Sequence, residues 1–137
     1  MDREEMNFMN EWQLKIDLES NSLVKVEEYI KKKIPLVIQE FLVIANASYP
    51  KKDMLIVDNI EYILNNILNF NENSEESFFI ALTMLKENIN DFIPFAKDGF
   101  GNYYLIDFDD LKVYFYNHEN NKIQYLSTFD TFIENLR

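Results

Sequence analysis

The stretch FIPFAKDGFGNYYLIDF, residues 92–108, holds both glycines of this 137-residue chain and decides how its second half is interpreted. It begins with a short apolar strand, Phe92 to Ala96, whose proline is of the kind found at sheet edges. Gly99 and Gly101 then predict a tight turn that needs positive φ. From Tyr103 to Phe108 the composition is again that of a strand, so the segment predicts a strand–turn–strand unit.

Downstream of this unit, two further strands are predicted at Lys112–Tyr116 and Lys122–Leu126, with polar turns before each. Connections this short require antiparallel pairing, because parallel strands need crossovers of roughly a dozen residues or more. Ser127 and Asp130 have the spacing of a capping box. They predict a last helix with its apolar residues on one face: Phe129, Phe132, Ile133 and Leu136.

Upstream, a short helix is predicted over residues 2–12, and another begins at Ser22, with Lys31 to Lys33 in its last turn. Pro35 suits the start of a helix running from Leu36 to Ala47. This helix is apolar on nearly every side and is expected to be buried on more than one face. The remaining predictions are strands at Met54–Val57 and around Ile63–Asn69, then a helix capped by Asn73 and Glu76 that contains Phe78, Ala81, Leu82, Leu85 and Ile89.

These elements predict an α+β domain with N-terminal helices, an antiparallel sheet of about 4–6 strands and a C-terminal helix packed on the sheet. The length of 137 residues suits a single domain over residues 1–137. Hydrophobic residues make up 47% of the chain, which is enough for a substantial core.

The chain contains 24 acidic and 13 basic residues, a net charge of -11. Such a surface repels nucleic acid and anionic membranes and attracts a basic protein partner. The chain has no cysteine, which excludes disulfides and thiolate chemistry. No apolar run approaches membrane-span length, and the first residues lack the features of a secretory signal, so a cytoplasmic location is expected.

The run from Phe92 to Tyr103 resembles the signature of the SUKH superfamily of Smi/Knr-like domains, whose members commonly show "IPFA-D-G-GN-Y". Asp107, the pair His118-Glu119 and the helix after Ser127 match later parts of the pattern. The likeness covers Ser20 to Leu136 and is strongest after Asp91. The chain departs from the pattern at Asn46-Ala47, where many members have Asn-Gly, and at Asn117, where many have Asp.

The resemblance implies a binding protein without an enzymatic reaction or a cofactor. Bacterial members of the superfamily are often immunity proteins that neutralise a cognate polymorphic toxin, and many of those toxins are nucleases. The alternative is a regulatory or scaffold domain of the fungal Smi/Knr type, which binds a cellular protein that is not a toxin. The sequence leaves both readings open, and it also leaves the oligomeric state open.

Several residues first suggest chemistry, but the patterns that chemistry needs are missing. A phosphate loop requires a helix after its glycines, and a strand follows Gly101 instead. Asp107, Asp109 and Asp110 lack the further oxygen ligands that calcium needs. His118 is the only histidine, and no catalytic set can be assembled around it. We therefore expect no catalytic residue and no metal site.

The partner surface is expected to consist of exposed acids near the turns and exposed tyrosines of the sheet. An acidic surface can steer a basic toxin into contact, and tyrosine offers apolar area with a polar tip. The candidates are Asp98, Tyr104, Asp107, Asp109, Asp110, Tyr116, Glu119 and Asp130. Gly99, Gly101 and Asn102 are assigned to a structural turn, and Glu72, Glu75 and Glu76 form an alternative acidic patch.

Overall fold

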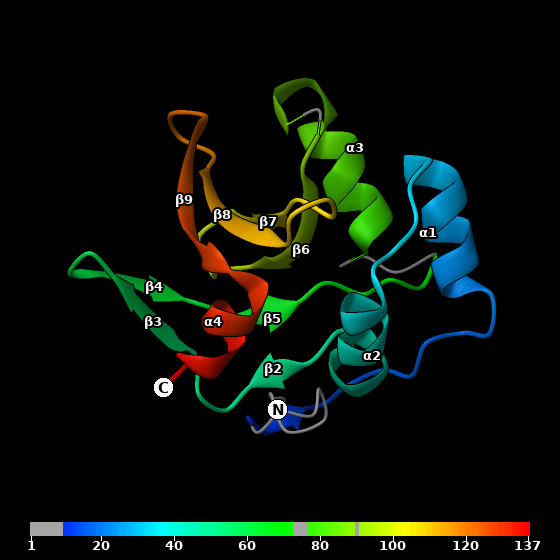
Figure 1. The fold of residues 1–137 in the computed structure, drawn as a ribbon, viewed down its shortest axis with the longest axis horizontal. Helices are drawn as coiled ribbons and strands as arrows, with labels where there is room; N and C mark the ends of the chain where they lie inside the picture. Colours follow the sequence, from blue (N-terminus) through cyan, green and yellow to red (C-terminus); the bar gives the residue numbers. More distant parts are fainter. Residues whose placement is uncertain (1–9, 73–76, 90) are drawn as a thin grey trace.

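The computed structural model describes residues 10–72, 77–89 and 91–137, and it confirms the α+β class (Figure 1). A five-stranded antiparallel sheet has the order β5-β6-β7-β8-β9, and two small sheets pair β1 with β2 and β3 with β4. The strands of the main sheet are β5 (Asn66–Ile67), β6 (Ile93–Lys97), β7 (Tyr103–Ile106), β8 (Lys112–Asn117) and β9 (Lys122–Thr128). The antiparallel pairing predicted for the last third of the chain is therefore confirmed.

The prediction that Phe92 to Ala96 forms an edge strand is wrong, because β6 lies between β5 and β7. Pro94 is tolerated there because the register with β7 shifts between Pro94 and Ala96. A β-bulge of this kind interrupts the hydrogen-bond ladder locally, and bulges are among the few places where a sheet accepts proline.

Different helices pack on the two faces of the main sheet. On one face, Tyr104 and Phe95 pack against Phe132 of the last helix, α4 (Phe129–Glu134), with ring centroids 5.5 and 5.7 Å apart. The C-terminal helix thus packs on the sheet as predicted. On the other face, Leu105 and Tyr116 cluster with Leu85 of α3 (Phe78–Ile89). Figure 1 shows the sheet curving strongly, with α3 beside β6.

Helix α1 (Ser22–Ile30) begins where the sequence predicted, and its C-cap Lys31 adopts a left-handed conformation. The lysines therefore follow the helix and do not lie in its last turn. Helix α2 (Leu36–Ala45) is less buried than expected. It buries a single face made of Val37, Ile38, Phe41, Leu42 and Ala45, and it exposes Leu36, Val43 and Ile44.

The helix predicted for residues 2–12 falls mostly outside the described residues. Its described end is wrong, because Trp12 belongs to β1 (Trp12–Gln13), which pairs with β2 (Tyr49–Pro50). The Trp12 ring meets the ring of Phe41 edge-on, at a centroid distance of 5.1 Å. This contact fastens the start of the described chain to α2.

The predicted strand at Met54–Val57 is β3, and it pairs with β4 (Ile60–Ile63) in a hairpin that projects from the body of the protein (Figure 1). Asp58 and Asn59 both have positive φ, as a two-residue hairpin turn requires. The single strand predicted around Ile63–Asn69 is wrong, since this segment is divided between β4 and the two-residue β5.

The start of α4 differs from its predicted cap, and the cap predicted for α3 falls outside the described residues. The Asn73–Glu76 pair lies outside the described residues, and Ser77 Oγ accepts a hydrogen bond from Ile80 N at 3.1 Å. In α4 the cap is Thr128, whose side chain accepts from Thr131 N at 3.4 Å. Ser127 is still in β9, paired with Val113 beside a register shift, so the N-cap lies one residue after the predicted Ser127.

The connection after α2 explains one departure from the SUKH-like pattern. Ala47 has φ of 60°, a left-handed conformation that glycine adopts without strain. Asn46 holds this turn in place, because its Oδ1 accepts from Phe70 N at 2.8 Å and its Nδ2 donates to Ile16 O at 2.9 Å. The alanine therefore occupies a backbone position suited to the glycine that many members have.

Candidate partner-binding surface

An aromatic row crosses the α3 side of the sheet at the end where β8 begins. The ring of Tyr114 lies 4.7 Å from that of Phe92 and 5.6 Å from that of Tyr125. The antiparallel register places Tyr114 opposite Tyr125, so their side chains share a face. Leu85, Leu105 and Tyr116 are the buried residues of this cluster, whereas Tyr125 is 44% exposed. We call Phe92, Tyr114 and Tyr125 the aromatic row.

The turn that joins β7 to β8 brings three aspartates to the same end of the sheet. Asp107 Oδ1 accepts from Asp109 N at 2.8 Å, and Asp110 Oδ1 accepts from Lys112 N at 3.0 Å. One carboxylate oxygen of each of these two residues therefore holds the turn. The Asp109 side chain is 81% exposed. We call residues 107–111 the acidic turn.

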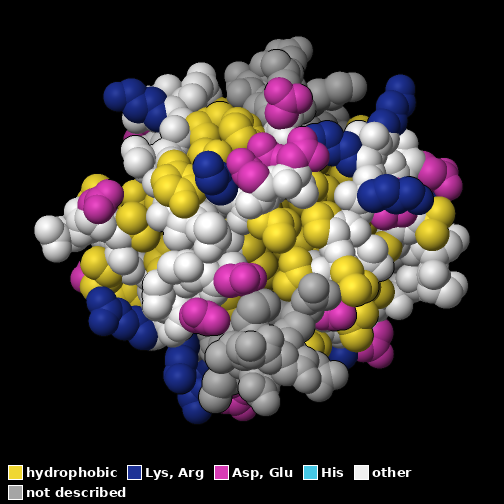
Figure 2. Space-filling view, viewed as in Figure 1, with side chains coloured by type: hydrophobic (Ala, Val, Ile, Leu, Met, Phe, Trp, Pro, Cys, Tyr) yellow, Lys and Arg dark blue, Asp and Glu magenta, His cyan; other side chains and the backbone are white. Residues whose placement is uncertain are grey.

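Basic side chains partly neutralise the acidic turn. Lys32 Nζ lies 3.4 Å from Asp109 Oδ2, and Lys112 Nζ lies 4.0 Å from Asp110 Oδ2. Figure 2 shows basic and acidic side chains next to one another around the exposed hydrophobic side chains of this face. Partial burial raises the pKa of Tyr114, and the Asp110 carboxylate adds to the rise. The Lys112 ammonium opposes this rise.

A hollow of about 320 Å³ adjoins the aromatic row, and Phe92 belongs to both. Its lining comes from α1, α3 and the start of β6 and consists of Tyr29, Ile30, Lys32, Leu82, Asp91, Phe92 and Ile93. The sequence did not single out Phe92, Tyr29 or Lys32 as surface residues. The signal in the sequence was that Phe92 is the first residue of the apolar run that opens the signature segment, where a side chain can reach the sheet's end.

Three of the predicted contact residues are buried, so the expectation that they are exposed is wrong. Asp98 is 6% exposed, and its carboxylate accepts from Phe100 N, Asn102 N and Asn102 Nδ2 at 2.8, 3.0 and 2.8 Å. Tyr104 donates to Ile63 O at 2.6 Å, and burial raises its pKa far above the ordinary value. Tyr116 donates to Asn121 Oδ1 at 2.6 Å. All three serve the folded structure.

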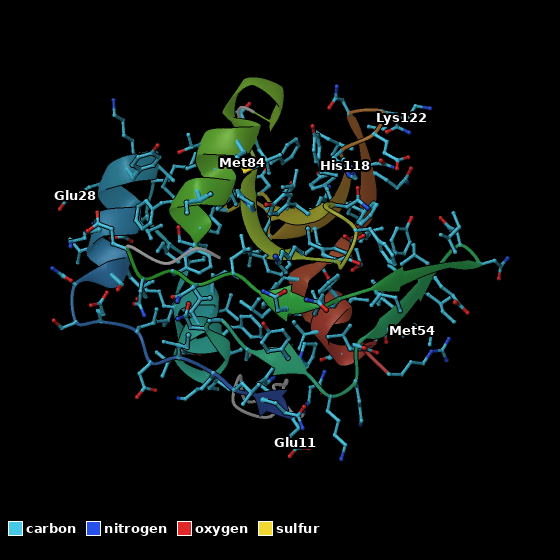
Figure 3. All side chains as sticks on the ribbon, turned by 180° about the vertical axis from the view of Figure 1, so that it is seen from behind. Glu11, Glu28, Met54, Met84, His118 and Lys122 are labelled. Carbon is cyan, nitrogen blue, oxygen red and sulfur yellow. The ribbon has the colours of Figure 1, made fainter. Side chains whose placement is uncertain are left out.

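The glycine turn packs against the loop between β8 and β9 and is hydrogen-bonded to it. Gly101 has φ of 91°, as predicted, and a Cβ there would lie 3.2 Å from the His118 ring. Gly99 has no positive φ, so that part of the prediction is wrong for it. Asn102 Oδ1 contacts His118 N at 3.0 Å and His118 Nδ1 at 2.7 Å. We call residues 98–102 and 117–121 together the loop end; Figure 3 shows His118 and Lys122 near it, at the tip of the β8–β9 hairpin.

The remaining predicted acids do not form one patch. Glu119 is exposed at the loop end, separated from the acidic turn by β8. Six residues of strand span roughly 20 Å. Asp130 is exposed in the first turn of α4, where its charge complements the helix dipole. Of the alternative patch, Glu72 bonds to Lys25 Nζ at 2.9 Å, and Glu75 and Glu76 lie outside the described residues.

Within the described ranges, no group of three or more His, Cys, Asp or Glu side chains could hold a metal ion. In the same part of the chain, no helix has the length and apolar character needed to cross a membrane.

Comparison with known proteins identifies the family. The model of the SMI1 / KNR4 family (SUKH-1) matches residues 18–135, which run from the approach to α1 through α4 and leave out β1. No curated protein matches the sequence. The match covers most of the chain and includes the signature segment, the glycine turn and the capped last helix. The chain therefore belongs to the SMI1 / KNR4 family (SUKH-1).

Proposed function

We propose that this protein is a single-domain bacterial immunity protein that binds and neutralises a cognate toxin in the cytoplasm. Family membership supports this proposal. The observation that carries the choice of surface is the aromatic row, which ends in the half-exposed Tyr125 beside the acidic turn. Tyrosine is enriched in the buried centre of protein interfaces, and charges suit the rim.

The partner in this proposal is a basic protein, for which a nuclease toxin is a natural candidate. Enzymes that bind nucleic acid carry positive charge, and the net charge of -11 attracts such a partner at long range. Steering of this kind raises association rates to roughly 10⁸–10⁹ M⁻¹s⁻¹ at low salt. The same charge opposes binding to nucleic acid or to an anionic membrane. The protein acts by covering the toxin and carries out no reaction of its own.

The test is co-expression with the toxin-like product of the neighbouring gene, followed by size-exclusion chromatography of the mixture. We expect protection of the cells and a stable complex. Replacing Tyr114 and Tyr125 by alanine should weaken the complex by about 2 kcal/mol or more for each anchor residue, or roughly thirtyfold in Kd.

Glu119→Gln is the matched control, because it removes an exposed charge at the loop end, away from the aromatic row. It should leave the Kd within about threefold of the wild-type value. If the neighbouring gene product is neither neutralised nor bound, the immunity function is wrong. A complex that depends on Glu119 and not on the tyrosines would move the interface to the loop end.

A further inference from the structure

Lys112 places a positive charge at one spot on the proposed surface. Its Nζ lies 5.9 Å from the centroid of the Tyr125 ring and 4.0 Å from Asp110 Oδ2. Lys112, Tyr114 and Tyr125 share a face of the sheet, because alternate residues of a strand point the same way and Tyr114 pairs with Tyr125. The ring and the carboxylate both favour a cation at this point.

Both contacts of the lysine are at the outer limit of what counts as an interaction. Cation–π attraction extends to about 6 Å, and an ion pair to about 4 Å. The Lys112 side chain is 48% exposed, so water screens what attraction remains. The Lys112 ammonium therefore occupies a position that favours a cation, but its contacts with the ring and with the carboxylate are both long.

The Asp110 carboxylate and the Tyr125 ring are held in position by contacts other than those with the Lys112 side chain. Asp110 Oδ1 accepts from the backbone N of Lys112 at 3.0 Å, which fixes the carboxylate and leaves Oδ2 on the side of the lysine Nζ. The Tyr125 ring meets the Tyr114 ring edge-on at 5.6 Å, and Tyr114 in turn packs on Phe92. If the lysine side chain moves away, the aromatic ring and the carboxylate remain in place.

We propose that Lys112 is a displaceable placeholder and that an arginine of the partner takes its position between the Tyr125 ring and Asp110 Oδ2. This inference rests on the proposed function for its choice of surface. A guanidinium is planar, stacks on an aromatic face, is weakly hydrated and can donate to a carboxylate oxygen at the ring's edge, whereas an ammonium is a compact and strongly hydrated charge. Arginine is therefore the better occupant of a site with one ring and one free carboxylate oxygen.

This arrangement predicts opposite effects for two neighbouring residues. Removing the lysine charge should strengthen binding of a guanidinium, because its competitor is gone and the local potential is more negative. Removing the Asp110 charge should weaken the same binding, because the carboxylate is the direct partner. A surface that responds only to net charge would give these signs as well, so a distant lysine is needed as a control.

The experiment is an NMR titration of the full chain with N-acetyl-arginine amide, and with the neutral isostere N-acetyl-citrulline amide. In the wild type, the arginine probe should shift the resonances of Tyr125 and Asp110 saturably, and the citrulline probe should not. Lys112→Met should lower the Kd about two- to fivefold, the range set by one exposed cation–π contact. Asp110→Asn should raise the Kd at least as much.

Lys122→Met is the matched control, since it removes the same charge at the opposite end of the β8–β9 hairpin. It should leave the Kd unchanged within about 1.5-fold. Equal binding of both probes, an equal effect of Lys122→Met, or weaker binding by Lys112→Met would overturn the placeholder role. Backbone amide spectra of each variant establish that it is folded. The titration tests only the placeholder role of Lys112, and the co-expression experiment tests only the immunity function. If the titration fails and the cells are still protected, the proposed function stands. If the cells are not protected, the result of the titration is unaffected.

Discussion

At the loop end of β7, Asp98 is 6% exposed and its carboxylate accepts three hydrogen bonds from its own loop, whereas in the acidic turn the Asp109 side chain is 81% exposed and meets Lys32 at 3.4 Å. Both residues lie in a turn next to β7, Asp98 before the strand and Asp109 after it. The first carboxylate replaces the backbone acceptors that a tight loop lacks, and the second remains available to solvent or to another molecule. Aspartates in the two turns that flank β7 thus stabilise the fold at one end of the sheet and supply surface charge at the other.

The largest difference in stability is expected between the variants Asp98→Ala and Asp109→Ala. Without the Asp98 carboxylate, the amides of Phe100 and Asn102 lose their acceptor. We expect the free energy of unfolding to fall by about 2–4 kcal/mol for Asp98→Ala and by no more than about 0.5 kcal/mol for Asp109→Ala. Urea denaturation followed by circular dichroism measures both. Equal losses in the two variants would remove the distinction between the two ends.

A second comparison separates the two glycines of the loop end. Gly101→Ala places a Cβ against the His118 ring and a side chain on a residue with φ of 91°, so it should cost about 1–2 kcal/mol of stability. Gly99→Ala meets no atom within 4 Å and should change stability by less than about 0.5 kcal/mol. Thermal unfolding of the two variants under identical conditions tests this order. A larger loss for Gly99→Ala would contradict the geometry of the turn.

The tyrosines on the two faces of the sheet should differ in their response to alkaline pH. Burial raises the folded-state pKa of Tyr104 above its ordinary value of 10.0, so its contribution to stability is complete below about pH 10 and declines as pH rises further. Tyr104→Phe should lose about 1 kcal/mol at neutral pH, because its hydrogen bond to Ile63 O disappears. It should also show a shallower decline of stability above pH 10 than the wild type.

Tyr114→Phe is the control for that pH experiment. Partial burial also raises the pKa of Tyr114, but the ring is partly exposed and faces both Asp110 and Lys112. The alkaline decline of this variant should stay close to that of the wild type. If Tyr104→Phe retains the full wild-type decline, another group is responsible for it.

Tyr125→Ala should cost less stability than the changes at Asp98, Gly101 and Tyr104. The side chain is 44% exposed and makes one edge-on contact with Tyr114, so we expect a loss of about 0.5 kcal/mol. The same change should weaken the toxin complex strongly, as set out above. Isothermal titration calorimetry beside urea denaturation separates the two quantities. A loss of stability as large as that of Asp98→Ala would assign Tyr125 to the core.

The sequence predicted what depends on local pattern. The strands of β7, β8 and β9 follow from their composition and short turns, and the left-handed Gly101 follows from a glycine between two strands. The structural role of Asp98 could also have been predicted from the sequence. An aspartate followed by Gly-Phe-Gly-Asn has the spacing at which its carboxylate accepts from the amides two and four residues later.

Burial that arises from distant parts of the chain could not be predicted. The hydroxyl of Tyr104 is satisfied by the carbonyl of Ile63, which lies 41 residues earlier and on a separate hairpin. The aromatic row depends on the register shift between Val113 and Tyr114, which brings Tyr125 opposite Tyr114. The apolar composition of α2 gave no sign that Leu36 and Val43 would be exposed, because composition alone does not fix how many neighbours a helix has.

The two faces of the main sheet differ in their tolerance of substitution. The α4 face is closed by rings such as those of Tyr104 and Phe132, 5.5 Å apart, where a change of volume disturbs the whole core. The aromatic row begins at the half-buried Phe92 and ends at an exposed ring, so new side chains there meet solvent on one side. Substitutions on the aromatic row can therefore accumulate over generations while the α4 face maintains the fold, and under the proposed function this would let the protein follow a toxin that keeps changing.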